Sequence, residues 1–194
     1  MAEKTFTHTI DVENDFGGRV QKTDGLDKGL PLIYKALKQK KVRALFFIST
    51  EIMETRYAVV QDILNEGHAI GAHGHFHHCF KEPWRQMQNM KLGESLLSEF
   101  QEHPHYRWPK FSYSHPGHLY SYPENHVSLL KYTWFGAKIS KEPIFYLHPF
   151  DVVESPNAPN LFCKILYSKP RAVYENFIDL LGRYPGSHRL GDDS

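Results

Sequence analysis

Two histidines four residues apart, together with two acids from a distant part of the chain, are the residues best suited to chemistry in this sequence. Residues 73–77 read His-Gly-His-Phe-His and follow the apolar run 68–72. Asp11 and Glu13 come at the end of another apolar run near the N-terminus. Two imidazoles and one carboxylate would supply three protein ligands and leave one coordination position open. Catalytic divalent-metal sites have this arrangement, whereas structural sites are closed.

The histidine spacing also has a simpler explanation. The chain contains 13 histidines, so a cluster can arise from side chains that pack in the core or face solvent. In an extended segment His73, His75 and His77 would share one face, whereas in a helical turn only His73 and His77 would. The spacing does not distinguish these conformations, so His75 and His78 are lesser candidates for ligands.

The elements that would position these groups alternate between strand and helix patterns. Strands are expected at residues 6–12, 42–48, 68–72, 110–114 and 143–147. Helices are expected at residues 26–40, 57–66, 84–100, 127–131 and 170–181. This alternation predicts an α/β fold with a mostly parallel sheet or an open barrel, whose active site lies beyond the carboxyl ends of the strands. Six candidate groups lie at such ends: Asp11, Glu13, His73, His77, His115 and His148.

Composition argues against several classes of partner. A chain of 194 residues with 41% hydrophobic and 23% charged residues is typical of a single globular domain, here residues 1–194. The formal charge of +1 gives no reason to expect nucleic acid or an anionic membrane surface as a partner. No run approaches about 18 consecutive apolar residues, so no membrane span is expected.

The cysteines and the N-terminal residues both favour a reducing compartment. Cys79 and Cys163 form no CxxC pair and imply no disulfide framework. Residues 1–8 are not followed by an apolar stretch of signal-peptide length. We therefore expect a cytoplasmic protein, and an oligomer is compatible with all of these features.

The order of the motifs resembles the polysaccharide deacetylase family, the NodB-type domain of carbohydrate esterase family 4. Residues 9–13 resemble its first acidic motif, and residues 44–48 its second strand. Residues 67–77 are close to the signature Gly-His-Glu-Ile-Gly-x-His-x3-His, which is the most specific match. Ser-His-Pro-Gly at 114–117 stands where the family has Arg-x-Pro-Gly, and residues 146–151 resemble its late Leu-His-Pro motif. The resemblance implies a distorted (β/α) barrel of about seven parallel strands.

The resemblance also implies a role for each candidate residue. Asp11 would be the general base and His148 the general acid that protonates the departing amine. The metal ligands would be Glu13, His73 and His77, and the ion would be zinc or another first-row divalent metal. The oxyanion would be held by the backbone N–H of Gly117, with Ser114 and His115 beside the substrate.

Two positions depart from the family pattern. Ser114 replaces an arginine that orients and neutralises the catalytic aspartate, and either His115 or Arg107 would have to take over that role. Glu13 stands where an aspartate is commoner and has a longer side chain. Asp15 is therefore an alternative ligand if its loop turns inward.

The activity implied is that of a metal-dependent hydrolase that removes an acetyl or formyl group from an amino sugar. Because a cytoplasmic location is expected, a glycan precursor, sugar nucleotide or lipid-linked sugar is the expected partner rather than a mature polymer. One alternative is a metal-independent hydrolase of ureides or cyclic amides from the same superfamily, in which the two histidines would hydrogen-bond the substrate. Another is a catalytically degenerate carbohydrate-binding module. Bound metal would separate the first two readings, and turnover of an N-acetylated sugar would separate both from the third.

Overall fold

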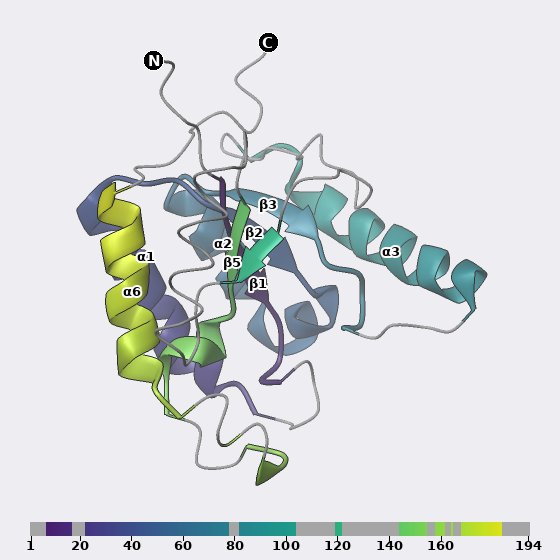
Figure 1. The fold of residues 1–194 in the computed structure, drawn as a ribbon. Coiled ribbons are helices and arrows are strands. Elements are labelled where there is room, and N and C mark those ends of the chain that lie inside the picture. The colour runs from purple at the N-terminus through teal and green to yellow at the C-terminus, as the bar shows by residue number, and fades with distance from the viewer. Residues whose placement is uncertain are drawn as a thin grey trace.

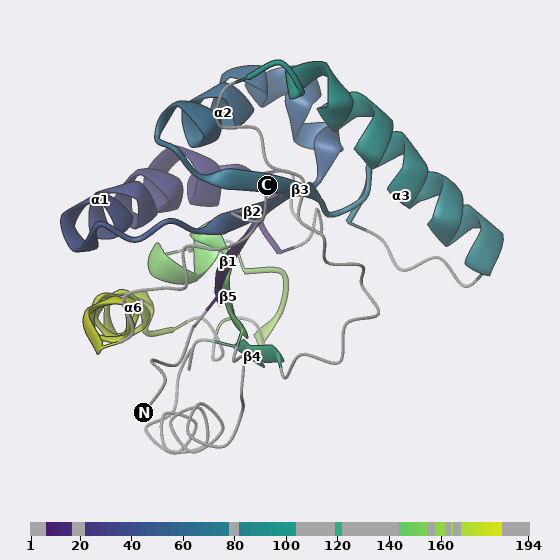
Figure 2. The same ribbon diagram turned by 90° about the horizontal axis from the view of Figure 1, so that it is seen from above.

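A curved sheet of parallel strands forms the centre of the computed structural model (Figure 2). The structure describes residues 7–16, 22–77, 82–103, 119–121, 144–154, 158–161, 164 and 168–183. In this part of the chain the sheet has five strands in the order β3-β2-β1-β5-β4, and every neighbouring pair is parallel. The strands are β1 (Thr7–Val12), β2 (Leu45–Ile48), β3 (Ala69–Ala72), β4 (Leu119–Ser121) and β5 (Ile144–Leu147). Their carboxyl ends therefore all meet at one edge of the sheet.

Helices connect the strands and cover the sheet. They are α1 (Leu30–Lys40), α2 (Met53–Asn65), α3 (Pro83–Leu97) and α6 (Pro170–Arg183). Shorter turns are η1 (Gly25–Gly29), η2 (Thr50–Ile52), η3 (Ser98–Phe100) and η4 (Pro149–Val152). α1 and α6 lie side by side, and α3 extends outward beyond β3 (Figures 1 and 2). No helix in the described ranges is long and apolar enough to cross a membrane.

The alternation of side chains along β1 separates core from site. Ile10 and Val12 are fully buried in the hydrophobic core, where burial of each side chain contributes about 1.5–3 kcal/mol. Asp11 alternates with them and therefore points to the other side of the sheet. Phe46 and Ile48 of β2 belong to the same core. Central strand β1 is thus fixed by its apolar residues while its carboxyl end carries the acids.

The expected strands and helices in the described ranges are confirmed, with shifted ends. β2 begins only at Leu45, because the Val42 N–H donates a hydrogen bond to the Leu37 carbonyl at the end of α1. The helix expected at 26–40 consists of a π-helical turn followed by α1. Gly67, with φ +83°, lies just past α2 as expected.

Two of the expected elements cannot be compared with the structure. The strand expected at 110–114 and the helix expected at 127–131 fall outside the described residues. β4 was not expected from the sequence, and it pairs with β5 over three residues, Leu119–Ser121. Of about seven expected strands, the described part of the chain contains the five given above.

Candidate active site

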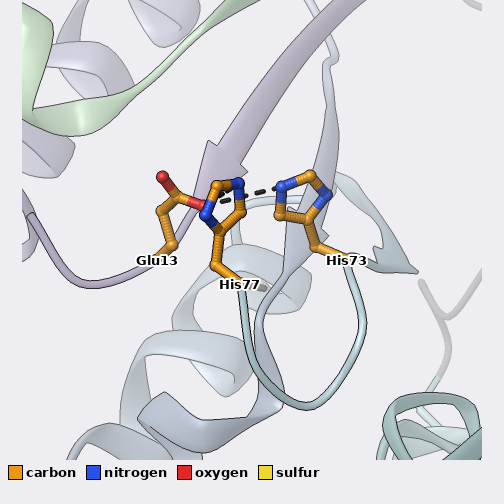
Figure 3. A group of neighbouring side chains, drawn as sticks. All are labelled: Glu13, His73 and His77. Atoms are coloured by element: carbon orange, nitrogen blue, oxygen red, sulfur yellow. Dashed lines mark ion pairs between the residues drawn. The ribbon is translucent and has the colours of Figure 1, made fainter. Parts of the chain in front are cut away.

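Three expected metal ligands meet at the carboxyl edge of the sheet. Glu13 follows β1, and His73 follows β3 and begins the loop that also carries His77. Both imidazoles face the Glu13 carboxylate (Figure 3), and its Oε2 lies 3.5 Å from His73 Nε2 and 3.2 Å from His77 Nε2. One candidate ligand atom from each residue lies within 4.8 Å of the others. Segments about 60 residues apart in sequence thus converge on one point.

The chemistry of this group fits a divalent ion. Glu13 is 2% exposed, and its Oε2 faces the two imidazole nitrogens without a well-formed hydrogen bond to either. A buried carboxylate that is only loosely paired is costly, and an ion bound between it and the imidazoles would remove that cost. Two histidines and one carboxylate are a donor set that zinc and other first-row divalent metals accept.

Two alternative ligands are placed elsewhere. His75 pairs through Nδ1 with the Thr50 hydroxyl at 3.1 Å and is not part of the group. Asp15 accepts hydrogen bonds from the backbone N–H groups of Gly25, at 2.9 Å, and Asp24, at 3.1 Å. It therefore holds the start of η1 rather than an ion, and its burial raises the pKa of its carboxyl. His78 lies outside the described residues.

The two histidines of this group differ in their electrostatic surroundings. For His73, burial lowers the pKa, but the Glu13 and Asp11 carboxylates outweigh it, so the pKa of His73 is raised. For His77, burial is the stronger effect, and the pKa is lowered despite the same carboxylates. A ligand nitrogen must be unprotonated to bind a metal, so an ion would compete with a proton mainly at His73.

The expected acid, His148, lies beside both carboxylates. It follows β5, and its Nε2 is 3.8 Å from Asp11 Oδ2 and 3.8 Å from Glu13 Oε1. Its Nδ1 lies 3.2 Å from the carboxylate of Asp151, which also accepts the backbone N–H of His148 at 2.7 Å. Because a carboxylate accepts hydrogen bonds, this contact fixes the Nδ1 proton and turns Nε2 toward the acids.

Charge around His148 keeps it protonated in the protein without an ion. Burial lowers its pKa, but Asp151, Asp11 and Glu13 outweigh burial and raise the pKa of His148 to about 10. A proton is therefore held at Nε2, where a departing amine could take it.

Asp11, the expected base, lies near His148 and near Glu13, His73 and His77, which we call the ligand group. Burial raises the pKa of its carboxyl, the positive charges of His73 and His148 oppose the rise, and Glu13 adds to it. A raised pKa makes the carboxylate a better proton acceptor.

Two supporting residues were not predicted from the sequence. Asp151 lies three residues after His148, and the turn η4 makes that spacing a contact; the spacing itself was visible in the Leu-His-Pro segment. The Glu51 carboxylate of η2 accepts the backbone N–H of His77, and burial raises its pKa. No sequence signal linked Glu51 to the histidines, because the contact depends on how β2 and β3 pair.

Four further candidates fall outside the described residues. They are Gly117, expected to hold the oxyanion, Ser114, and the two alternatives for taking over the role of the family arginine, His115 and Arg107. Their roles stay predictions.

The fold and the candidate site together point to a class of enzymes. His148, Asp11 and a group suited to a divalent ion lie at the carboxyl edge of a parallel α/β sheet, where α/β enzymes carry their active sites. A sequence model of the family described as polysaccharide deacetylase matches residues 23–121, about half of the chain, including His73 and His77. The chain belongs to the polysaccharide deacetylase family, whose members hydrolyse amide bonds of acetylated sugars.

Solved structures share the fold over nearly the whole chain. A variant of the peptidoglycan deacetylase PdaC from Bacillus subtilis is 12% identical with a TM-score of 0.57, and the match covers 94% of this chain and 86% of that one. The Xyl-CE4 domain of a multidomain xylanase from the hindgut metagenome of Trinervitermes trinervoides is 13% identical, with a TM-score of 0.57 and coverage of 95% and 86%. A CE4 esterase from Streptococcus mutans is 18% identical, with a TM-score of 0.53 and coverage of 92% and 83%. This likeness establishes the (β/α) barrel fold of the family. A comparison with curated proteins found no match.

Proposed function

We propose that this protein is a metal-dependent deacetylase that hydrolyses the acetamide group of an amino sugar. The observation that carries the proposal is the convergence of Glu13, His73 and His77, in which a buried carboxylate oxygen faces both imidazole nitrogens. In the metal-independent alternative the histidines would be turned toward a substrate. Here both Nε2 atoms instead face the same oxygen of Glu13, which favours the metal-dependent reading.

The ligand group would supply electrophilic help. A divalent ion held by Glu13, His73 and His77 would polarise the acetyl carbonyl and lower the pKa of bound water. Asp11 would accept a proton from the attacking water as the water oxygen bonds to the carbonyl carbon. His148 would then donate its Nε2 proton to the sugar nitrogen as the carbon–nitrogen bond breaks. The products are acetate and a free amine.

The surrounding residues tune these two proton transfers. Asp151 holds the Nδ1 side of His148, so that Nε2 stays directed at the reacting nitrogen. Asp11 and His148 are 3.8 Å apart, so one amide group could lie beside both, with the attacking water next to the base and the nitrogen next to the acid. The backbone N–H of Gly117 is proposed as the oxyanion donor, following the family pattern.

The proposed substrate is an N-acetylated amino sugar in a glycan or glycan precursor. PdaC is named as a peptidoglycan deacetylase, and an N-acetylated amino sugar within a glycan is the chemistry we carry over to this chain. A formyl group would meet the same residues. The cytoplasmic location and the choice of a precursor stay predictions.

Metal content and acetate release test the proposal together. Protein purified without chelator is titrated with zinc, and acetate is measured with oligomers of N-acetylglucosamine as substrate. We expect about one ion per chain and acetate release that stops on chelation and returns with zinc. His73→Ala should lose both, whereas the matched variant His75→Ala, two residues away in the same loop, should keep both.

Three results would contradict the proposal. A protein that binds no ion under added zinc, or one whose acetate release is indifferent to chelation, would favour the metal-independent reading. Sugar binding without acetate release would favour a binding module.

A further inference from the structure

The loop that carries both histidine ligands is held by hydrogen bonds along its backbone. We call residues 73–77 the ligand loop. It begins where the His73 N–H donates to the Ile48 carbonyl at 2.9 Å, at the end of β2. His73 is therefore placed by the sheet itself, whereas the position of His77 depends on what holds the rest of the loop.

One side of the ligand loop rests on η2. The Thr50 N–H donates to the Gly74 carbonyl at 3.0 Å, and the Glu51 N–H donates to the His75 carbonyl at 2.9 Å. The Glu51 carboxylate accepts the His77 N–H.

The other side is held by one residue of α3. Asn89 accepts the Phe76 N–H on its Oδ1 at 2.8 Å and donates from Nδ2 to the Phe76 carbonyl at 3.0 Å. Its backbone carbonyl accepts the His75 N–H at 3.1 Å. The Asn89 side chain is buried, with 7% of the residue exposed. It thus pairs with both polar backbone groups of Phe76, the residue directly before His77.

The helix comes close enough for this contact because glycines meet there. A Cβ on Gly93 would lie 2.8 Å from the backbone carbon of Gly74, so any side chain would push α3 away. Gly74 has φ +88°, a backbone conformation that favours glycine. The glycine at 93 therefore lets Asn89 reach the loop.

We propose that Asn89 is a positioning residue that sets the separation of His73 and His77 for ion binding. The side chain of asparagine offers one acceptor and one donor at the spacing of a peptide group, whereas aspartate offers acceptors alone and alanine offers neither. Without these bonds the N–H and the carbonyl of Phe76 would both lose their Asn89 partner, and His77 would no longer be held opposite Glu13. This inference rests on the proposed metal-dependent function.

Zinc affinity measured by competition with a chromophoric chelator tests the proposal. Asn89→Ala should bind zinc about 10- to 100-fold more weakly than the wild type, the usual effect of removing a residue that orients a ligand. Asn89→Asp keeps the acceptor for the Phe76 N–H but loses the donor, and should fall between the two. Gln88→Ala is the matched control, because Gln88 is exposed on the same helix, and its affinity should be unchanged.

A second measurement separates positioning from a general loss of structure. The visible spectrum of bound Co²⁺ reports ligand geometry, and it should change in Asn89→Ala while far-UV circular dichroism of the metal-free variant stays native. Equal zinc affinity and an unchanged cobalt spectrum in both folded variants would overturn the proposal. Loss of the metal-free fold in both variants would overturn it too, since Asn89 would then support the fold rather than the ligand. If the wild type itself bound no zinc, the proposed function would fail first.

Discussion

His148 and Asp11 lie 3.8 Å apart, and in the proposed reaction His148 would donate a proton whereas Asp11 would accept one. Burial raises the pKa of the Asp11 carboxyl more than the nearby positive charges lower it, which suits a base. His148 is held protonated by three carboxylates, which suits an acid. Neighbouring groups whose surroundings give them different protonation states are a recognised signature of an acid–base pair. The two residues therefore should respond differently to a change of leaving group.

The contrast can be measured with an amide and an activated ester. Asp11→Asn should lose about 10²–10⁴-fold in turnover on both N-acetylated sugar and 4-nitrophenyl acetate, because both reactions need an activated water. His148→Ala should lose a similar factor on the amide but much less on the ester, because 4-nitrophenolate leaves without a proton. Zinc content should stay near that of the wild type in Asp11→Asn. Equal losses for His148→Ala on the two substrates would exclude its role as the acid.

At the scale of elements, the strand pattern of the sequence predicted which candidate residues lie at strand ends. It did not predict the contacts between elements. Glu13, His73 and His148 were expected at strand ends, and parallel pairing brings those ends to one edge. The apolar runs of the three strands were sufficient to predict these positions. Asn89 was not predicted, because nothing in a helix sequence shows which loop its side chain will meet. The ends of elements also differ from those predicted. The strand β2 begins later than expected, because Val42 forms a backbone hydrogen bond to the end of α1.

His68 joins β3 to the core and gives the fold a pH dependence away from the site. Its Nδ1 accepts the Ala44 N–H at 3.4 Å, and its ring stacks on Tyr34. Burial lowers the pKa of His68 to about 4, whereas in the unfolded chain it is about 6.5. Between these values the unfolded state binds the proton more readily than the folded state. The stability contribution is therefore complete above about pH 6.5 and is lost as pH falls toward about 4.

Urea unfolding at pH 7 and pH 4.5 measures this contribution. The wild type should lose about 2–3 kcal/mol more stability than His68→Gln between the two pH values, because glutamine does not titrate. Comparing the change in unfolding free energy between the two proteins removes the effect of the other titrating groups, which both proteins share. Parallel pH profiles would mean that His68 is not held neutral by burial.

At the scale of the whole molecule, the ligand group joins segments that are far apart in the sequence and are not neighbours in the sheet. β1 and β3 are not neighbours in the sheet, since β2 lies between them. Their ends come together where Glu13, His73 and His77 meet, and the ligand loop bonds to residues at and just after the end of β2. An ion bound there would stabilise the folded chain, because the unfolded chain does not bring these three residues together.

Thermal unfolding with and without zinc measures this coupling. At a zinc concentration 100 times the dissociation constant, the folded state should gain about 2.7 kcal/mol, which for a chain of this size corresponds to a rise in Tm of about 5–10 °C. His73→Ala should show no rise, because it lacks a ligand, and His75→Ala should keep the full rise, because His75 bonds Thr50 instead of the ion group. The same rise in His73→Ala as in the wild type would mean that zinc stabilises the protein from another place. A wild-type Tm that does not respond to zinc would separate the buried carboxylate of Glu13 from metal binding altogether.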